Sequence, residues 1–250
     1  MTSVAEIAIP LTGICTTVPD PRAGVCLICR GCPGPGYDVC YACHHATSQV
    51  SLPCSLVVPI SLYEIPSQLH KFLRHYKSGK YPAAYQNDFS VRVVSILAYF
   101  VMKHTECIAT SGGGMWDLMT TVPSSKPQIG VHALVTAIQR VGALRKQYEP
   151  LLRLGSRPVG HLQANDRAFD ATQRLEGTRV LLIDDTYTTG ATAQSAASAL
   201  AIAGATVVAI LPIGRVINPS FNQENKDYWE RQRRMPFSFD TCCLESVDAG

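Results

Sequence analysis

The stretch RVLLIDDTYTTGAT, residues 179–192, places two adjacent aspartates directly after a run of apolar residues. Val180 to Ile183 are predicted to form a buried strand, because strands buried on both faces are continuous apolar runs. A turn over 184–190, an alanine-rich helix over about 191–203 and a strand over 206–213 are expected to follow. This order predicts a βαβ unit, and therefore an α/β fold with a parallel sheet flanked by helices.

The two aspartates, Asp184 and Asp185, stand where parallel α/β sheets bind ligands, beyond the carboxyl end of a strand. Adjacent carboxylates at the end of a buried strand cost free energy through repulsion and desolvation. A sugar diol or a cation nearby would offset this cost, since carboxylates accept hydrogen bonds from paired hydroxyls and bind cations. We therefore interpret the pair as acceptors for a diol.

The segment TTGAT, residues 188–192, opens the helix and supplies hydrogen-bond donors. The free N–H groups and positive end of a helix bind anions, and Gly190 lets the backbone come close to the ligand. The simpler alternative is an ordinary turn with one N-cap residue. Two acids and four threonines exceed what a cap needs, so the stretch has the pattern of a ribose 5-phosphate site.

The composition of the chain is that of a folded domain. Its 250 residues are 46% hydrophobic and 16% charged, which is enough for one large domain, alone or with a small module. The net charge of +3 does not by itself imply nucleic acid. The first residues lack a basic region and contain Glu6, so we expect a cytoplasmic protein with no membrane span.

Ten cysteines are many for such a chain, and they concentrate near its start. Cys26 and Cys29 form one CxxC pair, and Cys40 and Cys43 form another after ten intervening residues. Two such pairs predict a structural zinc site, because zinc can replace a core that a Pro- and Gly-rich segment cannot build. A redox CxxC is more often single. The sequence leaves open whether other residues also bind metal; the candidates are Cys15, Cys32, Cys54, His44, His45, Cys242 and Cys243. Cys242 and Cys243 could complete this site or form another.

Helical spacing of apolar residues predicts a helix around Leu69, Phe72, Leu73 and Tyr76, and a second over about 88–104. Other segments are less periodic. We expect strands at WDLMTTVP and EPLLRL, helices at VHALVTAIQRVG and SFNQENKDYWERQRR, and a long loop over 155–168. A loop of this length inside a compact domain is usually functional or mobile.

The stretch VLLIDDTYTTGAT resembles the phosphoribosyl pyrophosphate (PRPP) motif of type I phosphoribosyltransferases. The resemblance implies that Asp184 and Asp185 hold the ribose hydroxyls, and that Tyr187, at a position usually small and aliphatic, touches the ligand or a hood over the site. Thr188 stands where the hypoxanthine-guanine type has an acid thought to act as base; threonine is a poor base, which argues against that reaction. The remaining PRPP-binding residues implied are Thr186, Thr188, Thr189, Gly190, Ala191 and Thr192.

Two further segments take their roles from the same resemblance. The loop after DLMTTVP would hold pyrophosphate and Mg²⁺, with Ser124, Ser125 and Lys126 as candidates; an ordinary polar turn is the alternative. Residues 155–168 correspond to the loop that closes over the reaction, where Arg157, His161 and Arg167 are candidates to meet the departing pyrophosphate. The alternative for these three is solvated surface charge.

A zinc ribbon before such a domain resembles the layout of the ComF-type family, which is named for a role in competence and DNA uptake. LRHYKSGK and WDLMTTVPSS are similar to its Tyr-Lys-x-Gly and Asp-x-x-x-x-Val-Pro segments, and the likeness covers about residues 26–216. The implied organisation is a zinc-ribbon hood module over 1–60, a phosphoribosyltransferase domain over 61–217, and a C-terminal helix and Cys-Cys tail over 218–250 that packs on the module. One departure is Ile129, Gly130, Val131 and His132 in place of the family's Arg-Gly-Phe-Asn.

Three functions are consistent with these patterns. The first is an enzyme, expected as a homodimer, that transfers 5-phosphoribosyl from PRPP with Mg²⁺ to an unidentified acceptor. The second is a regulatory protein that binds PRPP without turnover, as the altered pyrophosphate loop suggests. The third is a zinc-ribbon protein that binds single-stranded nucleic acid, for which Arg22, Arg30, Tyr37 and Tyr41 are few basic and aromatic residues.

Overall fold

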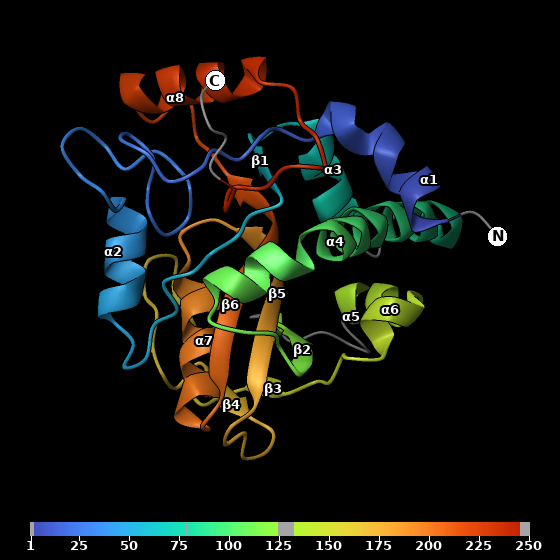
Figure 1. The fold of residues 1–250 in the computed structure, drawn as a ribbon, viewed down its shortest axis with the longest axis vertical. Helices are drawn as coiled ribbons and strands as arrows, with labels where there is room; N and C mark the ends of the chain where they lie inside the picture. Colours follow the sequence, from blue (N-terminus) through green and yellow to red (C-terminus); the bar gives the residue numbers. More distant parts are fainter. Residues whose placement is uncertain (1–2, 79, 125–132, 246–250) are drawn as a thin grey trace.

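The computed structural model describes residues 3–78, 80–124 and 133–245, and its centre is a parallel sheet (Figure 1). The four strands lie in the order β1 (Ser61–Tyr63), β6 (Thr206–Val216), β5 (Arg179–Tyr187) and β2 (Leu118–Thr121). Each neighbouring pair is parallel. The predicted α/β class with a parallel sheet is therefore confirmed.

The apolar run of β5 divides its side chains between the two faces of the sheet. Val180 and Leu182 join a core shared with α7 (Ala191–Ile202), whereas Leu181 and Ile183 join the core on the opposite face. The strand is longer than the sequence predicted: Asp184 to Tyr187 stay in the ladder, where Asp184 pairs with Pro212. The expected turn over 184–190 is therefore wrong for its first four residues.

The second face of the sheet is covered by α4 (Ala83–Ser111), with α3 (Gln68–His75) beside it. α4 extends several residues beyond the predicted 88–104 at both ends. Length and composition alone would allow it to cross a membrane, but 61% of its most apolar window is buried in the fold. The smaller elements around this face are α1 (Val4–Ala8), η1 (Ile9–Ile14), α5 (Ala133–Ile138) and α6 (Gly142–Arg145).

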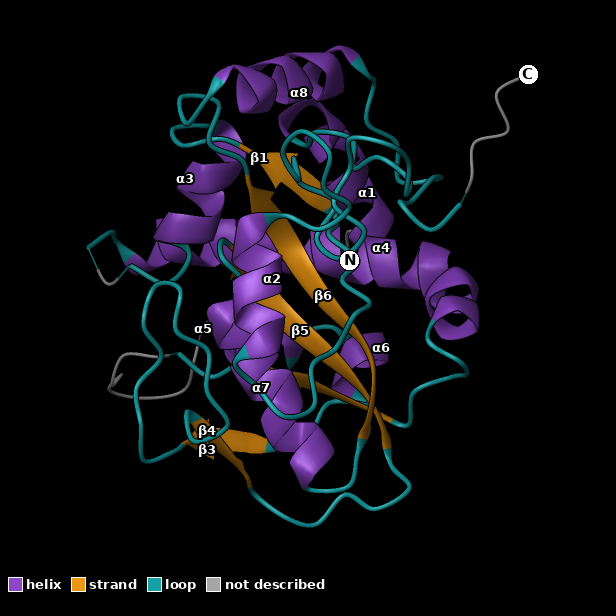
Figure 2. Ribbon diagram, turned by 90° about the vertical axis from the view of Figure 1, so that its left-hand side faces the viewer, coloured by secondary structure: helices purple, strands orange, loops and turns teal. Residues whose placement is uncertain are grey.

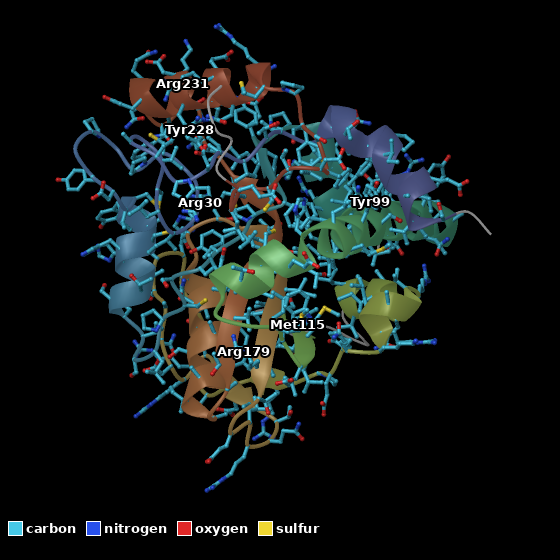
Figure 3. All side chains as sticks on the ribbon, viewed as in Figure 1. Arg30, Tyr99, Met115, Arg179, Tyr228 and Arg231 are labelled. Carbon is cyan, nitrogen blue, oxygen red and sulfur yellow. The ribbon has the colours of Figure 1, made fainter. Side chains whose placement is uncertain are left out.

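The end of α4 is fastened to the start of β5 by Arg179. Its guanidinium donates to the carbonyl oxygens of Met115 and Gly112, each at 2.8 Å (Figure 3). These carbonyls lie at and just beyond the carboxyl end of the helix, where backbone acceptors are free and positive charge is favourable. The contact fixes where the strand begins relative to the helix layer.

The N-terminal segment does not stand apart from the sheet. α2 (Tyr41–Ser48) lies beside α7 (Figure 2), and the chain then runs along β6, where the Val58 and Ile60 N–H groups donate to Ile210 and Pro212. α8 (Gln223–Arg234) lies across the upper end of the molecule (Figure 1). A short antiparallel pair, β3 (Leu152–Leu154) and β4 (Phe169–Ala171), flanks the predicted loop 155–168.

Candidate functional site

Asp185 is already paired within the protein. Its Oδ2 atom accepts a hydrogen bond from the Tyr76 hydroxyl at 2.5 Å, and the Lys77 ammonium lies 2.5 Å from the same atom. Both residues follow the last turn of α3, whose packing beside the sheet places them there. Only 7% of the Asp185 surface is exposed, so these two partners replace the water that a buried carboxylate loses. The sequence pattern contained Tyr76 and Lys77 but gave no sign that they meet this aspartate.

Asp184 lies beside it in a different environment. Its Oδ1 atom accepts the Asp185 backbone N–H at 2.8 Å, and the ammonium of Lys77 pairs with Asp185 instead. Burial, and next the charge of Asp185, raise the pKa of Asp184 to about 7. Asp184 is therefore the member of the pair whose carboxylate does not contact Tyr76 or Lys77 through these bonds.

The turn 188–192, named the phosphate turn after the ligand that the sequence predicts for it, forms a small pocket with Asp184. The pocket measures about 70 Å³ and is lined by Asp184, Thr186, Tyr187, Thr188, Thr189, Gly190, Thr192 and Ala193. Gly190 has φ +85°, and a Cβ there would lie 2.2 Å from the Tyr187 hydroxyl oxygen. Only glycine fits this position, where the chain enters α7, and Thr192 and Ala193 of the first turn line the pocket. The predicted carboxylate and the predicted anion turn are thus brought together.

A larger pocket of about 620 Å³ adjoins the small one, since Thr188 and Thr189 line both. Its other walls come from the cysteine segment, from the residues between β6 and α8, and from His161. Two aromatic side chains at its rim are widely exposed, Tyr41 at 66% and Phe221 at 74%. This larger pocket therefore opens next to the turn 188–192 and is lined in part by aromatic side chains.

The long loop is held against the protein body. The Thr189 hydroxyl donates to the His161 carbonyl, and the Asp166 carboxylate accepts from Ser51 N–H at 3.0 Å and from the Ser198 hydroxyl at 2.7 Å. His161 therefore lies beside the phosphate turn. Arg157 and Arg167 are exposed and line neither of the two pockets.

Of the three pyrophosphate-loop candidates, Ser124 lies just beyond the end of β2. The Val122 N–H donates to the Ile183 carbonyl at 2.9 Å, so this end of β2 runs next to Asp184. Ser125, Lys126 and the segment 129–132, where the sequence departs from the ComF-type pattern, lie outside the described residues. The topology therefore brings one of the predicted residues towards the site.

The four predicted zinc ligands converge. The thiols of Cys26, Cys29, Cys40 and Cys43 lie within 4.8 Å of one another, all buried and free of disulfides. Cys29 and Cys40 Sγ are 3.8 Å apart, close to the edge of about 3.8 Å that a tetrahedral zinc site with four thiolate ligands has. This buried group could hold zinc. All residues between Cys26 and Cys43 are described and form turns and the start of α2, not the β-hairpin that a ribbon implies.

The donors around the thiols also fit a metal centre. The Cys40 N–H donates to Cys26 Sγ at 3.3 Å, an interaction that disperses thiolate charge. Hydrogen bonds from Cys26, Cys40 and Cys43 hold the pKa of Cys29 well below its usual value. Arg30 follows the first CxxC pair directly and adopts φ +60° in the turn there. Its carbonyl oxygen accepts a hydrogen bond from the Tyr228 hydroxyl of α8 (Figure 3).

Arg215 and Tyr187 connect the cysteine group to the phosphate turn. Arg215, 8% exposed, donates to the Thr188 carbonyl at 2.8 Å and lies over the Tyr187 ring at 5.6 Å. Burial acts to lower the pKa of Arg215, but the cysteine group raises it overall. The Tyr187 hydroxyl reaches Cys43 Sγ at 3.6 Å. An arginine in an otherwise apolar strand was the available sequence signal for this link.

No protein-family model matches the chain, and no curated protein matches it significantly. The resemblance to ComF-type phosphoribosyltransferases therefore rests on the motif residues themselves. The geometry adds that Asp184 and the turn 188–192 line one small pocket, and that a larger pocket adjoins it at the same edge of the sheet.

Proposed function

We propose that this site binds the 5-phosphoribosyl group of PRPP with Mg²⁺, and that the chain is a phosphoribosyltransferase of the ComF type. The observation that carries the proposal is the small pocket in which Asp184 and the turn 188–192 meet. A ribose 5-phosphate needs hydroxyl acceptors and phosphate donors a few ångströms apart, and this pocket offers both. Asp184 would accept the diol, and the α7 N-terminus would receive the phosphate.

The adjoining larger pocket is the proposed place of the acceptor. Tyr41 and Phe221 offer aromatic surface, and Asn218 offers an amide, so a planar nitrogenous base fits its chemistry. In the reaction, the acceptor nitrogen bonds to the ribose anomeric carbon as the bond to pyrophosphate breaks. Positioning and electrostatic stabilisation would supply most of the rate, since Thr188 is a poor base.

Two metals belong to the proposal. Mg²⁺, when bound with PRPP, supplies positive charge to the phosphate oxygens. Ser124, Ser125 and Lys126 are the candidate residues of the loop that would hold pyrophosphate and this ion. Zinc in the Cys26–Cys43 group would be structural, because all four ligands come from the protein. The zinc group would thereby shape the wall of the acceptor pocket that Cys32 to Ala42 provide.

The experiment that tests the proposal is a thermal shift with PRPP plus Mg²⁺, followed by pyrophosphate release against a panel of bases and amines. We expect PRPP to raise the melting temperature in the wild type and not in Asp184→Asn. Pyrophosphate release with one acceptor supports the transferase, and stabilisation without release supports a regulatory PRPP-binding protein. No stabilisation contradicts both. Salt-dependent binding of single strands that survives Asp184→Asn would instead favour nucleic-acid recognition.

A further inference from the structure

A second group of metal-ligating side chains lies far along the chain from the cysteine pairs. It contains His104 and Cys107 from α4 together with Cys242 and Glu245 from the tail, with ligand atoms within 4.8 Å of one another. Cys242 belongs to the Cys-Cys pair that the sequence left without a place. Its thiol contacts Cys107 on α4 and lies outside the group that the N-terminal cysteines form.

The orientation of His104 points to a ligand. Its ring is 2% exposed, and Nε2 faces the Phe239 carbonyl at 3.0 Å, so Nε2 carries the proton. The lone pair is then on Nδ1, which has no hydrogen-bond partner among the described residues and faces Glu245 Oε1 at 3.6 Å. A backbone carbonyl that fixes the far nitrogen is the usual support of a metal-binding histidine.

The spacing of the four donors is close to that of a tetrahedral ion. Cys107 and Cys242 Sγ are 3.3 Å apart, and His104 Nδ1 is 3.6 Å from the Glu245 carboxylate. Zinc bonds of about 2.0–2.3 Å give edges of about 3.8 Å between two sulfurs and about 3.4 Å between nitrogen and oxygen, so the two thiols separate by about 0.5 Å when the ion binds. Both cysteines are free thiols in the structure.

The tail is brought to α4 by contacts outside the group. Lys103 pairs with Asp240 at 2.9 Å, and Phe239 packs on Tyr99 of α4 with ring centres 5.2 Å apart. Glu245 Oε2 accepts the Cys242 N–H at 3.2 Å, which leaves Oε1 for an ion. α4 itself departs from helical geometry at His104, with φ −116° and ψ 17°. The group is therefore preorganised by its surroundings.

We propose that His104 Nδ1, Cys107 Sγ, Cys242 Sγ and Glu245 Oε1 bind a zinc ion that fastens the tail to α4. Two thiolates and an imidazole select zinc over the hard cations magnesium and calcium. All four ligands belong to the protein, so the site is structural. The full chain then holds two zinc ions, one in each group.

The test counts zinc in the purified full-length chain after dialysis against metal-free buffer. We expect two equivalents in the wild type and one in Cys242→Ser. The matched control is Cys32→Ser, which removes an equally half-buried cysteine outside both groups and should retain two equivalents. Two equivalents in Cys242→Ser would overturn the proposal, as would one equivalent in the wild type that Cys242→Ser retains.

Three further measurements separate zinc binding from loss of fold and from disulfide formation. Glu245→Gln changes an exposed side chain and should weaken zinc binding at the second site about tenfold or more, with the melting curve of the zinc-free chain unchanged. Cobalt substitution should show fewer thiolate charge-transfer transitions in Cys242→Ser than in the wild type. A mass two daltons low in the metal-treated wild type, from a Cys107–Cys242 disulfide, would contradict the proposal.

Discussion

The Lys77 ammonium and the Asp185 carboxylate lie 2.5 Å apart, and this pair explains how the chain tolerates adjacent aspartates at the end of a buried strand. Tyr76 donates to the same carboxylate oxygen. One acid is paired with the two residues that follow α3, and the other, Asp184, is the group with a raised pKa. The two aspartates therefore have different surroundings: Asp185 is paired within the protein, and Asp184 lines the small pocket.

Replacing Lys77 with alanine should destabilise the fold by about 1–2 kcal/mol, because Asp185 then keeps a buried charge without its cation. The value is below that for a fully buried pair, since the Lys77 side chain is 33% exposed. Urea denaturation at pH 7 measures the change. In the double variant Lys77→Ala/Asp185→Asn most of the loss should be recovered, and an unchanged single variant would show that the pair contributes nothing.

The pKa of Asp184, about 7 in the folded protein against about 4 in an unfolded chain, predicts a pH dependence of stability. The folded state binds the proton more tightly, so the free energy of unfolding should fall as pH rises from about 4 to about 7. Denaturation of the wild type and of Asp184→Asn across this range measures the effect. The two proteins should follow the same trend below about pH 4 and diverge above it.

Ligand binding should show the opposite trend at the same residue. An ionised Asp184 can accept hydrogen bonds from both hydroxyl groups of a diol, whereas the protonated acid is a weaker hydrogen-bond acceptor. Stabilisation by PRPP with Mg²⁺ is therefore expected to increase as pH rises through about 7. A stabilisation that is flat with pH, with Asp184→Asn equally responsive, would remove Asp184 from the binding site.

Gly190→Ala should abolish stabilisation by PRPP and cost about 1–3 kcal/mol in folding, because alanine at φ +85° is strained and its Cβ meets the Tyr187 ring. The matched control is Gly142→Ala, since Gly142 has open space around its Cβ and lies at the start of α6. Thermal melts with and without ligand separate the two effects. Equal ligand response in both variants would contradict the role of the turn.

The sequence predicted the centre of this fold because local pattern and topology agree there. The apolar run of β5 and the alanines of α7 each specify an element, and a strand followed by a helix and a strand closes in parallel. The end of β5 was missed because Asp184 to Tyr187 look like turn residues, whereas pairing with β6 overrides that local preference. The convergence of the two CxxC pairs could be predicted because their cysteines are close in sequence.

The contacts that could not be predicted join residues far apart in the chain. Cys107 and Cys242 are 135 positions apart, and Lys77 meets Asp185 only because α3 packs beside the sheet. The contacts of Arg215 are a similar case, because nothing in the sequence around this residue of β6 indicates that it meets Thr188 and Tyr187. Such pairs follow from tertiary packing, which a single sequence does not encode in any local period.

The link from the cysteine group to the phosphate turn predicts that zinc removal weakens PRPP binding. With zinc bound, the four thiolates give the group a net negative charge that pairs with Arg215, which in turn holds the Thr188 carbonyl. Without the metal, Cys40 and Cys43 regain protons because their pKa values are raised, and the four side chains lose the ion that holds them together. The anionic partner of this buried arginine is thereby weakened. A zinc-selective chelator that spares Mg²⁺ should therefore reduce the PRPP-induced thermal shift. Arg215→Met should reduce that shift even in the zinc-loaded protein, because the Thr188 carbonyl loses its donor. An undiminished shift in Arg215→Met, together with intact zinc, would mean that the turn is held without this arginine.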